Sequence, residues 1–591
     1  MAIKTNTANA VVREACSNII SALGCTTKEN FENAMNGVSG IKPTNDTTLY
    51  PTPFLSQRIN DEQVEKNIPV FSSLDSKEYT RLERLMIASV SQATSSGDFN
   101  EILKSERTIF IFSTTKGNVR LLEQDNQHPQ EGAFLYQMAQ KVAGYFGAKN
   151  EPVIVSQACI SGVVAQLVAE RLLKAKEYET AIVIGGDELT EFTISGFQSF
   201  KSVSEHPCRP YDAKRDGLSM GEGVATIVYS TLPQFDTPQA IFIKQGSTSN
   251  DANHISGPSR TGEELGWAIK SALQSNGHNF TTDAIDAHGT ATLYNDEMES
   301  KAIGVAGLTD KELLSLKGYF GHTLGASGLL ETVICNEGLR QQRLPSTLGF
   351  SELGVPIPVN VRTQSGGFYG KSIVKTASGF GGCNAAILLG KDADGSNTYH
   401  LHRNYRNLAQ CSIADKAVKT QGKVIFDGSK EENFGTFIRA AFKNISEPYA
   451  KFPKMDDLCK LAVTAVEYLW READHSQENE YETALLIATT SSSLDTDLRH
   501  QQSIAVKDPY IPSPAIFVYT LNNIMEGEIC IRHKIKGENL CLVCKDKAEA
   551  QKQLRRYADL LLSNHYAKRC IVGYVDYLQG KYEADFEDLG C

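Results

Sequence analysis

The sequence predicts an α/β protein in which short buried strands alternate with amphipathic helices. Thr108–Phe112 and Ala181–Ile184 are short apolar runs, typical of strands buried in a sheet, and Tyr79–Ala93 has the spacing of a helix. The same alternation returns after Ile241 and again after Leu408. Alternating strands and helices favour a sheet with parallel pairing. A chain of 591 residues is long enough for about two to four domains.

Composition narrows the class of protein. The net charge of −11 and the lack of a Lys/Arg-rich block argue against nucleic-acid binding. No apolar stretch is long enough to span a bilayer, and the first ten residues lack the apolar region of a signal peptide. The 13 cysteines are scattered, so we expect reduced thiols and a cytoplasmic protein.

The first stretch of the chain contains the clearest candidate for chemistry. Val153–Val155 predicts a buried strand, and apolar residues at Val164, Leu167, Val168 and Leu172 predict a helix. Cys159 would lie at the turn between them, where the positive end of the helix dipole favours a thiolate. A small buried hydrophobic role is the alternative. On this stretch alone the two interpretations are equally supported.

The other elements follow in order along the first two stretches. We expect a strand from Val11, a helix from Thr26 and a polar surface excursion over Thr44–Leu74. Later predicted elements are a helix over Ala133–Phe146, strands over Gly223–Tyr229, Ser372–Ala377 and Ala385–Leu389, a strand end over Ala284–Ala287, and helices over Glu263–Ser275, Glu297–Val305 and Gly328–Leu339. The predicted boundaries are 1–235, 236–392, a linker over 393–420, and 421–591.

Three further segments carry chemistry. Asp286-Ala-His288-Gly-Thr290-Ala-Thr292 places one histidine at a strand end, and Lys317-Gly-Tyr-Phe-Gly-His322 places another in a glycine-rich turn. Ser378-Gly379-Phe380-Gly-Gly-Cys-Asn predicts a turn between two strands. Each alone is more often structural than catalytic. Their joint occurrence with Cys159 is much more specific.

Four segments occur along the chain in this order: ACISG, HGTATLYND, KGYFGHTLGASG and GFGGCN. On these segments the first ~390 residues resemble an elongating β-ketoacyl-acyl carrier protein synthase. CRPYDAKRDGLSMGEGVA is also similar to a segment of that family. The resemblance implies the thiolase fold, a duplicated α/β unit stacked in five layers, α/β/α/β/α. It also implies a decarboxylative Claisen condensation between a Cys-bound acyl group and malonyl-acyl carrier protein.

By this resemblance Cys159 holds the acyl chain, and His288 and His322 bind the malonyl thioester. The backbone N–H groups of Cys159 and Phe380 resemble an oxyanion hole, and Lys317 and Glu299 resemble the pair that supports the histidines. The expected substrate-binding residues are Thr290, Thr292, Ser378, Gly379 and Phe380. These residue types fit the chemistry. A nucleophile that holds the acyl group divides the condensation into two easier steps, and hydrogen-bond donors stabilise the enolate that forms when the malonyl group loses carbon dioxide. No metal or cofactor is implied, since the substrates are carried on the phosphopantetheine of the carrier protein.

The sequence departs from the family at a few positions. Ser378 stands where many fatty-acid members have phenylalanine, which suggests a wider or more polar acyl entrance. Ala291 and Cys383 are changes of similar volume. Cys541 and Cys544 have the spacing of half a zinc site, but no second pair follows, which favours thiols buried in the core. His400 and His402 are two possible metal ligands, but two ligands alone do not form a metal site.

The stretch after Leu408 resembles the start of the chain. Ala484–Leu498 matches Ile109–Glu123, and Arg569–Asp576 matches Ala181–Glu188. The stretch is similar to the truncated synthase-like domains found beside aryl polyene pathways. Asp546 or Lys547 falls where Cys159 falls, so we expect no synthase chemistry there. Half of a duplicated fold leaves a sheet edge and a face that need cover.

The predicted function is therefore a β-ketoacyl-acyl carrier protein synthase in a specialised fatty-acid, polyene or polyketide pathway. Two alternatives stay open: a non-catalytic partner like a chain-length factor, or an acyltransferase or malonyl decarboxylase that never condenses. The expected partners are acyl carrier protein and a second ketosynthase-like subunit, in a homodimer or heterodimer. No nucleic acid and no membrane span are expected.

Overall fold

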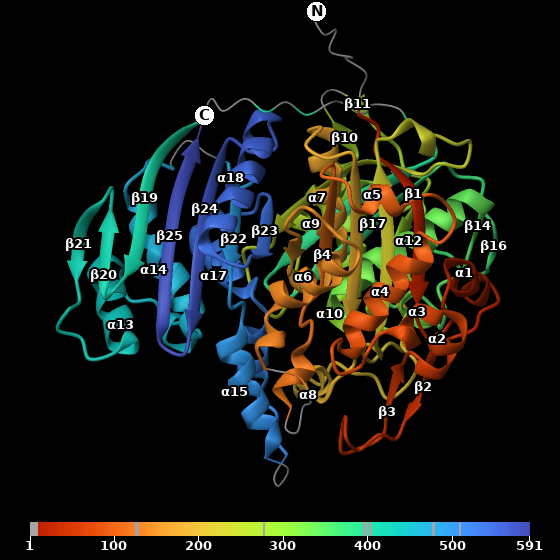
Figure 1. Ribbon diagram of the computed structural model, residues 1–591, viewed down its shortest axis with the longest axis horizontal. Coiled ribbons are helices and arrows are strands. Elements are labelled where there is room, and N and C mark those ends of the chain that lie inside the picture. Colours follow the sequence, from red (N-terminus) through yellow and green to blue (C-terminus); the bar gives the residue numbers. More distant parts are fainter. Residues whose placement is uncertain are drawn as a thin grey trace, which may run out of the picture.

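The protein, seen here as a computed structural model, consists of three α/β units that follow one another along the chain (Figure 1). The structure describes residues 10–590 except 124–127, 129, 276–277, 394–398, 400, 402–404, 476–478 and 507–509. Within this part of the chain, no helix is long and apolar enough to cross a membrane. His400 and His402, the two histidines of the predicted linker, lie outside the described residues.

Each unit contains the same five-strand pattern, in which two neighbouring pairs are parallel and two are antiparallel. In sheet order, the first unit has β5 (Val153–Val155), β4 (Thr108–Ser113), β6 (Thr180–Asp187), β8 (Gly223–Ser230) and β1 (Arg13–Ile20). The second has β13 (Glu312–Leu314), β12 (Ala284–Asp286), β17 (Ser372–Gly379), β18 (Cys383–Gly390) and β9 (Phe242–Asn250). The third has β23 (Asn539–Val543), β22 (Thr483–Thr489), β24 (Arg569–Leu578), β25 (Lys581–Gly590) and β19 (Arg406–Ala414).

The first two units stack in five layers. The central layer contains α7 (Ser161–Lys174) and α12 (Ser327–Gln341), which contact each other and both sheets. The outer layers are formed by α4 (Arg81–Ala93) with α6 (Leu135–Tyr145), and by α9 (Glu263–Ala272) with α10 (Leu293–Ala306). Every residue of α7 is buried, as expected of a helix between two sheets. The duplicated five-layer fold that the sequence predicted is confirmed.

The two central helices approach each other closely where the site lies. A Cβ atom on Gly162 would come within 2.6 Å of the backbone N of Leu329, and one on Gly328 within 2.6 Å of a methyl carbon of Val163. Real Cβ atoms essentially never come this close to another atom. The glycines of ACISG and GASG therefore allow the helices that follow Cys159 and His322 to pack together.

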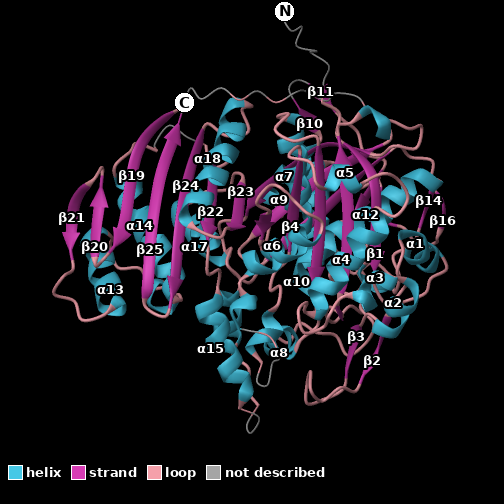
Figure 2. Cartoon of the chain, in the orientation of Figure 1, coloured by secondary structure: helices cyan, strands magenta, loops and turns pink. Residues whose placement is uncertain are grey.

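The third unit extends the sheet of the first (Figure 2). Its strand β23 pairs antiparallel with β5, with Leu542 opposite Val155 and Val543 opposite Ile154. The strand β5 would otherwise leave unpaired N–H and C=O groups at the edge of the sheet. The third unit has α14 (Asp457–Arg471) and α17 (Ile524–His533) on one face and α18 (Lys547–Ser563) on the other. The edge of the third unit at β23 is therefore covered by the body of the same chain.

A shared hydrogen-bond pattern relates the third unit to the first. The carboxylate of Asp187, at the end of β6, accepts hydrogen bonds from the hydroxyl of Thr114 and the N–H groups of Thr115 and Lys116. Asp576, in β24, accepts the corresponding bonds from Thr489, the last residue of β22, and from the N–H groups of the two residues that follow it. The predicted repeat therefore extends to the contacts of individual side chains.

Three sequence predictions differ from the structure. Thr44–Leu74 is more than a surface excursion, because it contains β3 (Phe54–Gln57), α2 (Asp61–Asn67) and α3 (Pro69–Ser73) and buries Phe71. The predicted linker 393–420 extends too far at its C-terminal end, because β19 already pairs with β25 from Arg406 onward.

The third difference concerns the position expected to match Cys159. Three residues separate β23 from α18, whereas five separate β5 from α7, so neither Asp546 nor Lys547 occupies a nucleophile position. Asp546 caps α18, and Lys547 forms ion pairs with Glu583 and Asp585. Cys541 and Cys544 are buried in the core, as predicted.

Candidate active site

Cys159 lies on a strained turn between β5 and α7. The preceding residue, Ala158, has a φ of +46°, a conformation that residues other than glycine rarely adopt. The strained turn places the thiol at the N-terminus of α7, and Cys159 is only 8% exposed. The strand-to-helix position predicted from the sequence is therefore correct.

The protonation state of the thiol differs from the thiolate that the helix dipole suggested. Burial raises the pKa of Cys159 to about 12, although the positive charge of Lys317 and the N–H groups of Cys159 and Phe380 act in the opposite direction. In the free protein Cys159 is consequently a neutral thiol at neutral pH. Its attack on a substrate requires the loss of a proton.

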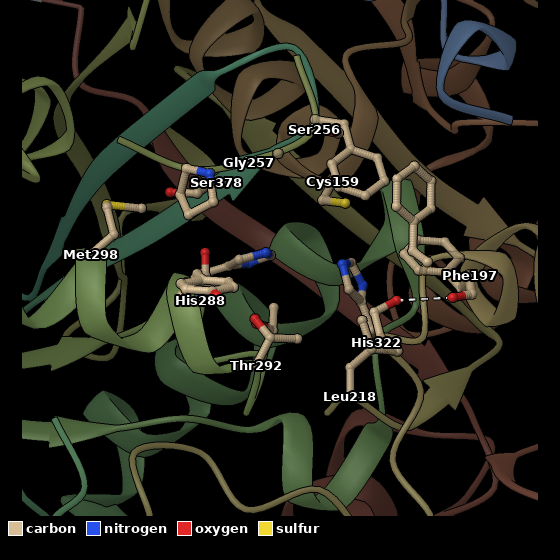
Figure 3. A pocket seen from close by; sticks show the side chains of 18 of the residues that line it. Cys159, Phe197, Leu218, Ser256, Gly257, His288, Thr292, Met298, His322 and Ser378 are labelled. Carbon is tan, nitrogen blue, oxygen red and sulfur yellow. Dashed lines mark hydrogen bonds between the residues drawn. The ribbon is translucent and has the colours of Figure 1, made fainter. Parts of the chain in front are cut away.

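Two imidazoles lie beside this thiol. His288 follows β12, and His322 lies in the turn between α11 (Lys317–Phe320) and α12. Their ring centroids are 5.3 Å apart and their planes nearly perpendicular, at 87°. The sulfur of Cys159 and a nitrogen of each ring all lie within 4.8 Å of one another. Figure 3 shows the three side chains directed into the same space.

The hydrogen bonds around His322 fix its tautomer. The N–H of Leu324 donates to Nδ1 of His322 over 3.1 Å, so Nδ1 carries no hydrogen. Burial, reinforced by the charge of Lys317, lowers the pKa of both histidines well below the usual value, and both are neutral. His322 therefore carries its hydrogen on Nε2.

Glu299 and Lys317 lie in the same region but have different partners. Glu299 accepts hydrogen bonds from the N–H groups of His288 and Gly289 over 2.7 and 2.8 Å and so fixes the backbone of the first histidine. Lys317 forms a buried ion pair with Glu331 of α12. The sequence suggested one supporting pair, whereas the structure contains two separate supports.

The ion pair of Lys317 belongs to a network that the sequence analysis missed. Glu331 also pairs with Lys375 over 2.7 Å, and Lys375 lies 3.2 Å from Asp286. Burial alone would raise the pKa of Glu331, but Lys317 and Lys375 together hold it below the usual value. Two lysines close to the neutral histidines are thus held in place by one glutamate.

The three reactive groups line one cavity of about 240 Å³. All of the predicted substrate-binding residues also line it: Thr290, Thr292, Ser378, Gly379 and Phe380. The hydroxyls of Thr290 and Thr292 lie 2.9 Å apart, and that of Ser378 donates to Asn384 over 2.8 Å. The lining also includes the apolar side chains of Phe197, Phe200, Leu218 and Met298, which the sequence analysis did not single out.

Comparison with known families assigns these residues to one group. The domain described as "Beta-ketoacyl synthase, N-terminal domain" matches residues 17–234, and "Beta-ketoacyl synthase, C-terminal domain" matches 240–351. Together the two ranges span more than half of the chain. The chain belongs to the β-ketoacyl synthase family. Both matches end before the third unit of this chain.

The relatives differ in the share of their own length that this chain matches. A polyketide β-ketoacyl synthase relative from Streptomyces cyaneus is 32% identical over 273 residues, which is 43% of this chain and 63% of that protein. The 3-oxoacyl-[acyl-carrier-protein] synthase 2 of Staphylococcus aureus is 27% identical and is matched over 63% of this chain and 96% of its own length. This chain thus spans less than two thirds of the length of the Streptomyces relative.

Two solved structures resemble different shares of this chain. A ketosynthase (ApeO) in complex with its chain length factor (ApeC) from Xenorhabdus doucetiae is 25% identical, with a TM-score of 0.57, and covers 64% of this chain and 98% of its own. PfaC keto synthase–chain length factor is 13% identical, with a TM-score of 0.77, and covers 98% of this chain and 78% of its own. The second similarity is one of fold alone, and it includes the third unit.

Proposed function

We propose that this chain is a β-ketoacyl-acyl carrier protein synthase that condenses a Cys159-bound acyl group with malonyl-acyl carrier protein. The observation that carries the proposal is the convergence of one buried thiol and two buried, neutral imidazoles on one cavity. The relatives named 3-oxoacyl-[acyl-carrier-protein] synthase 2 support the carrier protein as the substrate carrier. On this proposal the chemistry needs no cofactor besides the phosphopantetheine of the carrier.

The first step is acyl transfer to Cys159. The sulfur attacks the thioester carbonyl, the new S–C bond replaces the bond to the phosphopantetheine sulfur, and that sulfur leaves with the proton of the thiol. Since Nε2 of His322 already carries a hydrogen, His288 is the imidazole available to move this proton. The N–H groups of Cys159 and Phe380, which already favour a thiolate at Cys159, would stabilise the tetrahedral oxyanion.

The second step forms the carbon–carbon bond. When the malonyl group loses carbon dioxide, negative charge develops on its thioester oxygen. Neutral N–H donors such as Nε2–H of His322 stabilise this enolate oxygen without transferring a full charge. The enolate carbon then attacks the acyl carbonyl on Cys159, and the cysteine leaves as a thiolate that takes up a proton. Glu299 would act by holding the backbone of His288, and the charge of Lys317 would act by keeping both histidines neutral.

We infer further that the third unit takes the place of a separate ketosynthase-like subunit at the edge of β5. The backbone groups of this edge are already paired with β23, and Ser156 N–H donates to Cys541 C=O over 3.1 Å. The similarity of the whole chain to a fold described as keto synthase–chain length factor supports this inference. The alternative of a non-catalytic chain-length factor is disfavoured, because Cys159 and both histidines are present around a cavity.

The test uses the purified chain alone with a panel of acyl-carrier thioesters. Intact-mass measurement should detect one added acyl group, and peptide mapping should locate it on Cys159. Addition of malonyl-carrier should then release carbon dioxide and produce the β-ketoacyl-carrier. Acyl label only on another cysteine, or activity only after a second ketosynthase-like protein is added, would contradict these proposals.

A further inference from the structure

The third unit reaches the turn that carries Phe380. The side-chain amide of Asn523, directly before α17, donates from Nδ2 to the backbone C=O of Phe380 over 2.7 Å. The same nitrogen lies 3.5 Å from the sulfur of Cys383, at the other end of the turn. A carbonyl oxygen accepts and cannot donate, so the amide nitrogen must face Phe380. A residue of the third unit is thereby in contact with a turn that lines the active-site cavity.

Asn523 does not use its side chain for its own helix. It occupies the N-cap position of α17, where an asparagine oxygen commonly accepts a hydrogen bond from the first turn. Here the side chain forms no capping hydrogen bond, and its buried Oδ1 has no hydrogen-bond partner among the described residues. Asn523 is only 1% exposed, so water does not satisfy this oxygen freely. The side chain therefore contacts Phe380 instead of forming the N-cap hydrogen bond that this position favours.

Two glycines allow α17 to lie directly on the turn. A Cβ atom on Gly527 would come within 2.6 Å of the carbonyl oxygen of Gly381. A Cβ atom on Gly381, whose φ is +92°, would come within 2.6 Å of Nδ2 of Asn523. Any larger side chain at either position would separate the helix from the turn.

The neighbouring carbonyls of the turn are held by the second unit. Asn250 donates its side-chain N–H to Gly381 C=O over 3.0 Å, and the N–H of Asp251 donates to Gly382 C=O over 2.7 Å. Phe380 C=O accepts from the thiol of Cys383 over 3.3 Å and from Asn523 over 2.7 Å, so it is the turn carbonyl that the third unit helps to hold. The peptide N–H of the same residue is one of the two groups that favour a thiolate at Cys159.

We propose that Asn523 is a positioning residue for acyl transfer, which holds the Phe380 turn so that its N–H is directed at the reacting carbonyl on Cys159. This inference rests on the proposed function, because it concerns the acylation half-reaction. It assigns a role in that step to a unit that has no nucleophile position of its own. Decarboxylation of the malonyl group depends on the histidines, so Asn523 should affect the two half-reactions differently.

The test compares two half-reactions in the full chain. Asn523→Asp has nearly the same shape, but its carboxylate cannot donate to Phe380. It should slow single-turnover acylation of Cys159 by about tenfold or more, as expected when an oxyanion donor is misplaced. Decarboxylation of malonyl-carrier without acyl donor should stay within about twofold of the parent. Asn523→Ala adds no charge and should likewise slow acylation while leaving decarboxylation nearly unchanged. If one of the two variants fails to fold, the other still tests the inference.

Asn522→Asp is the matched control. Asn522 is equally buried, and its Oδ1 accepts from the hydroxyl of Ser156 over 3.4 Å, a role that an aspartate retains. This variant should change neither half-reaction by more than about twofold. Parent-like acylation in both Asn523 variants, or an equal loss of both half-reactions, would overturn the inference. If the parent itself never acylates Cys159, the proposed function fails first, and that outcome is seen before any variant is compared.

Discussion

Replacement of Glu538 by glutamine should destabilise the whole chain, because it removes the partner of a buried cation between two units. Glu538, which precedes β23, pairs bidentately with Arg171 of α7, with N–O distances of 2.6 and 3.1 Å. The side chains of Arg171 and Glu538 are 1% and 2% exposed. Breaking a buried pair from one side typically costs about 3–5 kcal/mol, since the remaining charge keeps its desolvation penalty.

The size of the chain converts this cost into a melting shift. At about 2.1 cal/mol/K per residue, 591 residues give an unfolding entropy of about 1.2 kcal/mol/K. Glu538→Gln should therefore lower Tm by about 2–4 °C in differential scanning fluorimetry. The double variant Arg171→Met with Glu538→Leu removes both charges and should recover most of the loss. The reasoning is refuted if the single variant melts within 1 °C of the parent, or if the double variant melts no higher than the single.

Three further predictions concern the site. His288→Ala and His322→Ala should each reduce condensation by about 100-fold or more, and the double variant should be little worse than either single one. Acylation of Cys159 should persist in His322→Ala and be slower in His288→Ala, because His288 moves the thiol proton. Near-normal turnover in both single variants would contradict this account. Ser378→Phe should narrow the entrance and penalise bulky or rigid acyl groups by about 1–3 kcal/mol, and an equal effect on every chain length would count against it. Because burial raises the pKa of Cys159 to about 12, its alkylation by iodoacetamide should accelerate steadily from pH 7 to pH 9, since the reactive thiolate fraction grows with pH; a plateau below pH 9 would show a lower pKa.

Sequence patterns predicted the fold and singled out the three residues that meet in the cavity, because both depend on local signals. Strands such as β4 and β6 are apolar runs, and Cys159, His288 and His322 lie in glycine-rich segments at strand ends and turns. The supports of these groups have no such signal. Glu331 lies on a predicted helix, but its pairing with Lys317 and Lys375 joins three segments that only the folded sheet brings together.

Long-range contacts explain the remaining errors. In Thr44–Leu74, charged residues surround Ile59, Val64 and Phe71, so the segment reads as polar although these side chains are buried against the first unit. The pairing of β23 with β5 could not be predicted, because an apolar strand does not specify which edge it will join. The contact of Asn523 with Phe380 follows from that pairing and was likewise hidden.

The most direct test of the central claim is the mass of the carrier-bound product. Purified parent protein, given an acyl-carrier thioester and malonyl-carrier, should convert the malonyl-carrier to a β-ketoacyl-carrier two carbons longer than the acyl donor. Cys159→Ala should form none of it, although the two histidines that remain could still release carbon dioxide from malonyl-carrier. Formation of the β-ketoacyl-carrier by Cys159→Ala at the parent rate, or its absence with the parent for every acyl donor tested, would contradict the assignment of Cys159, His288 and His322 as one condensing site.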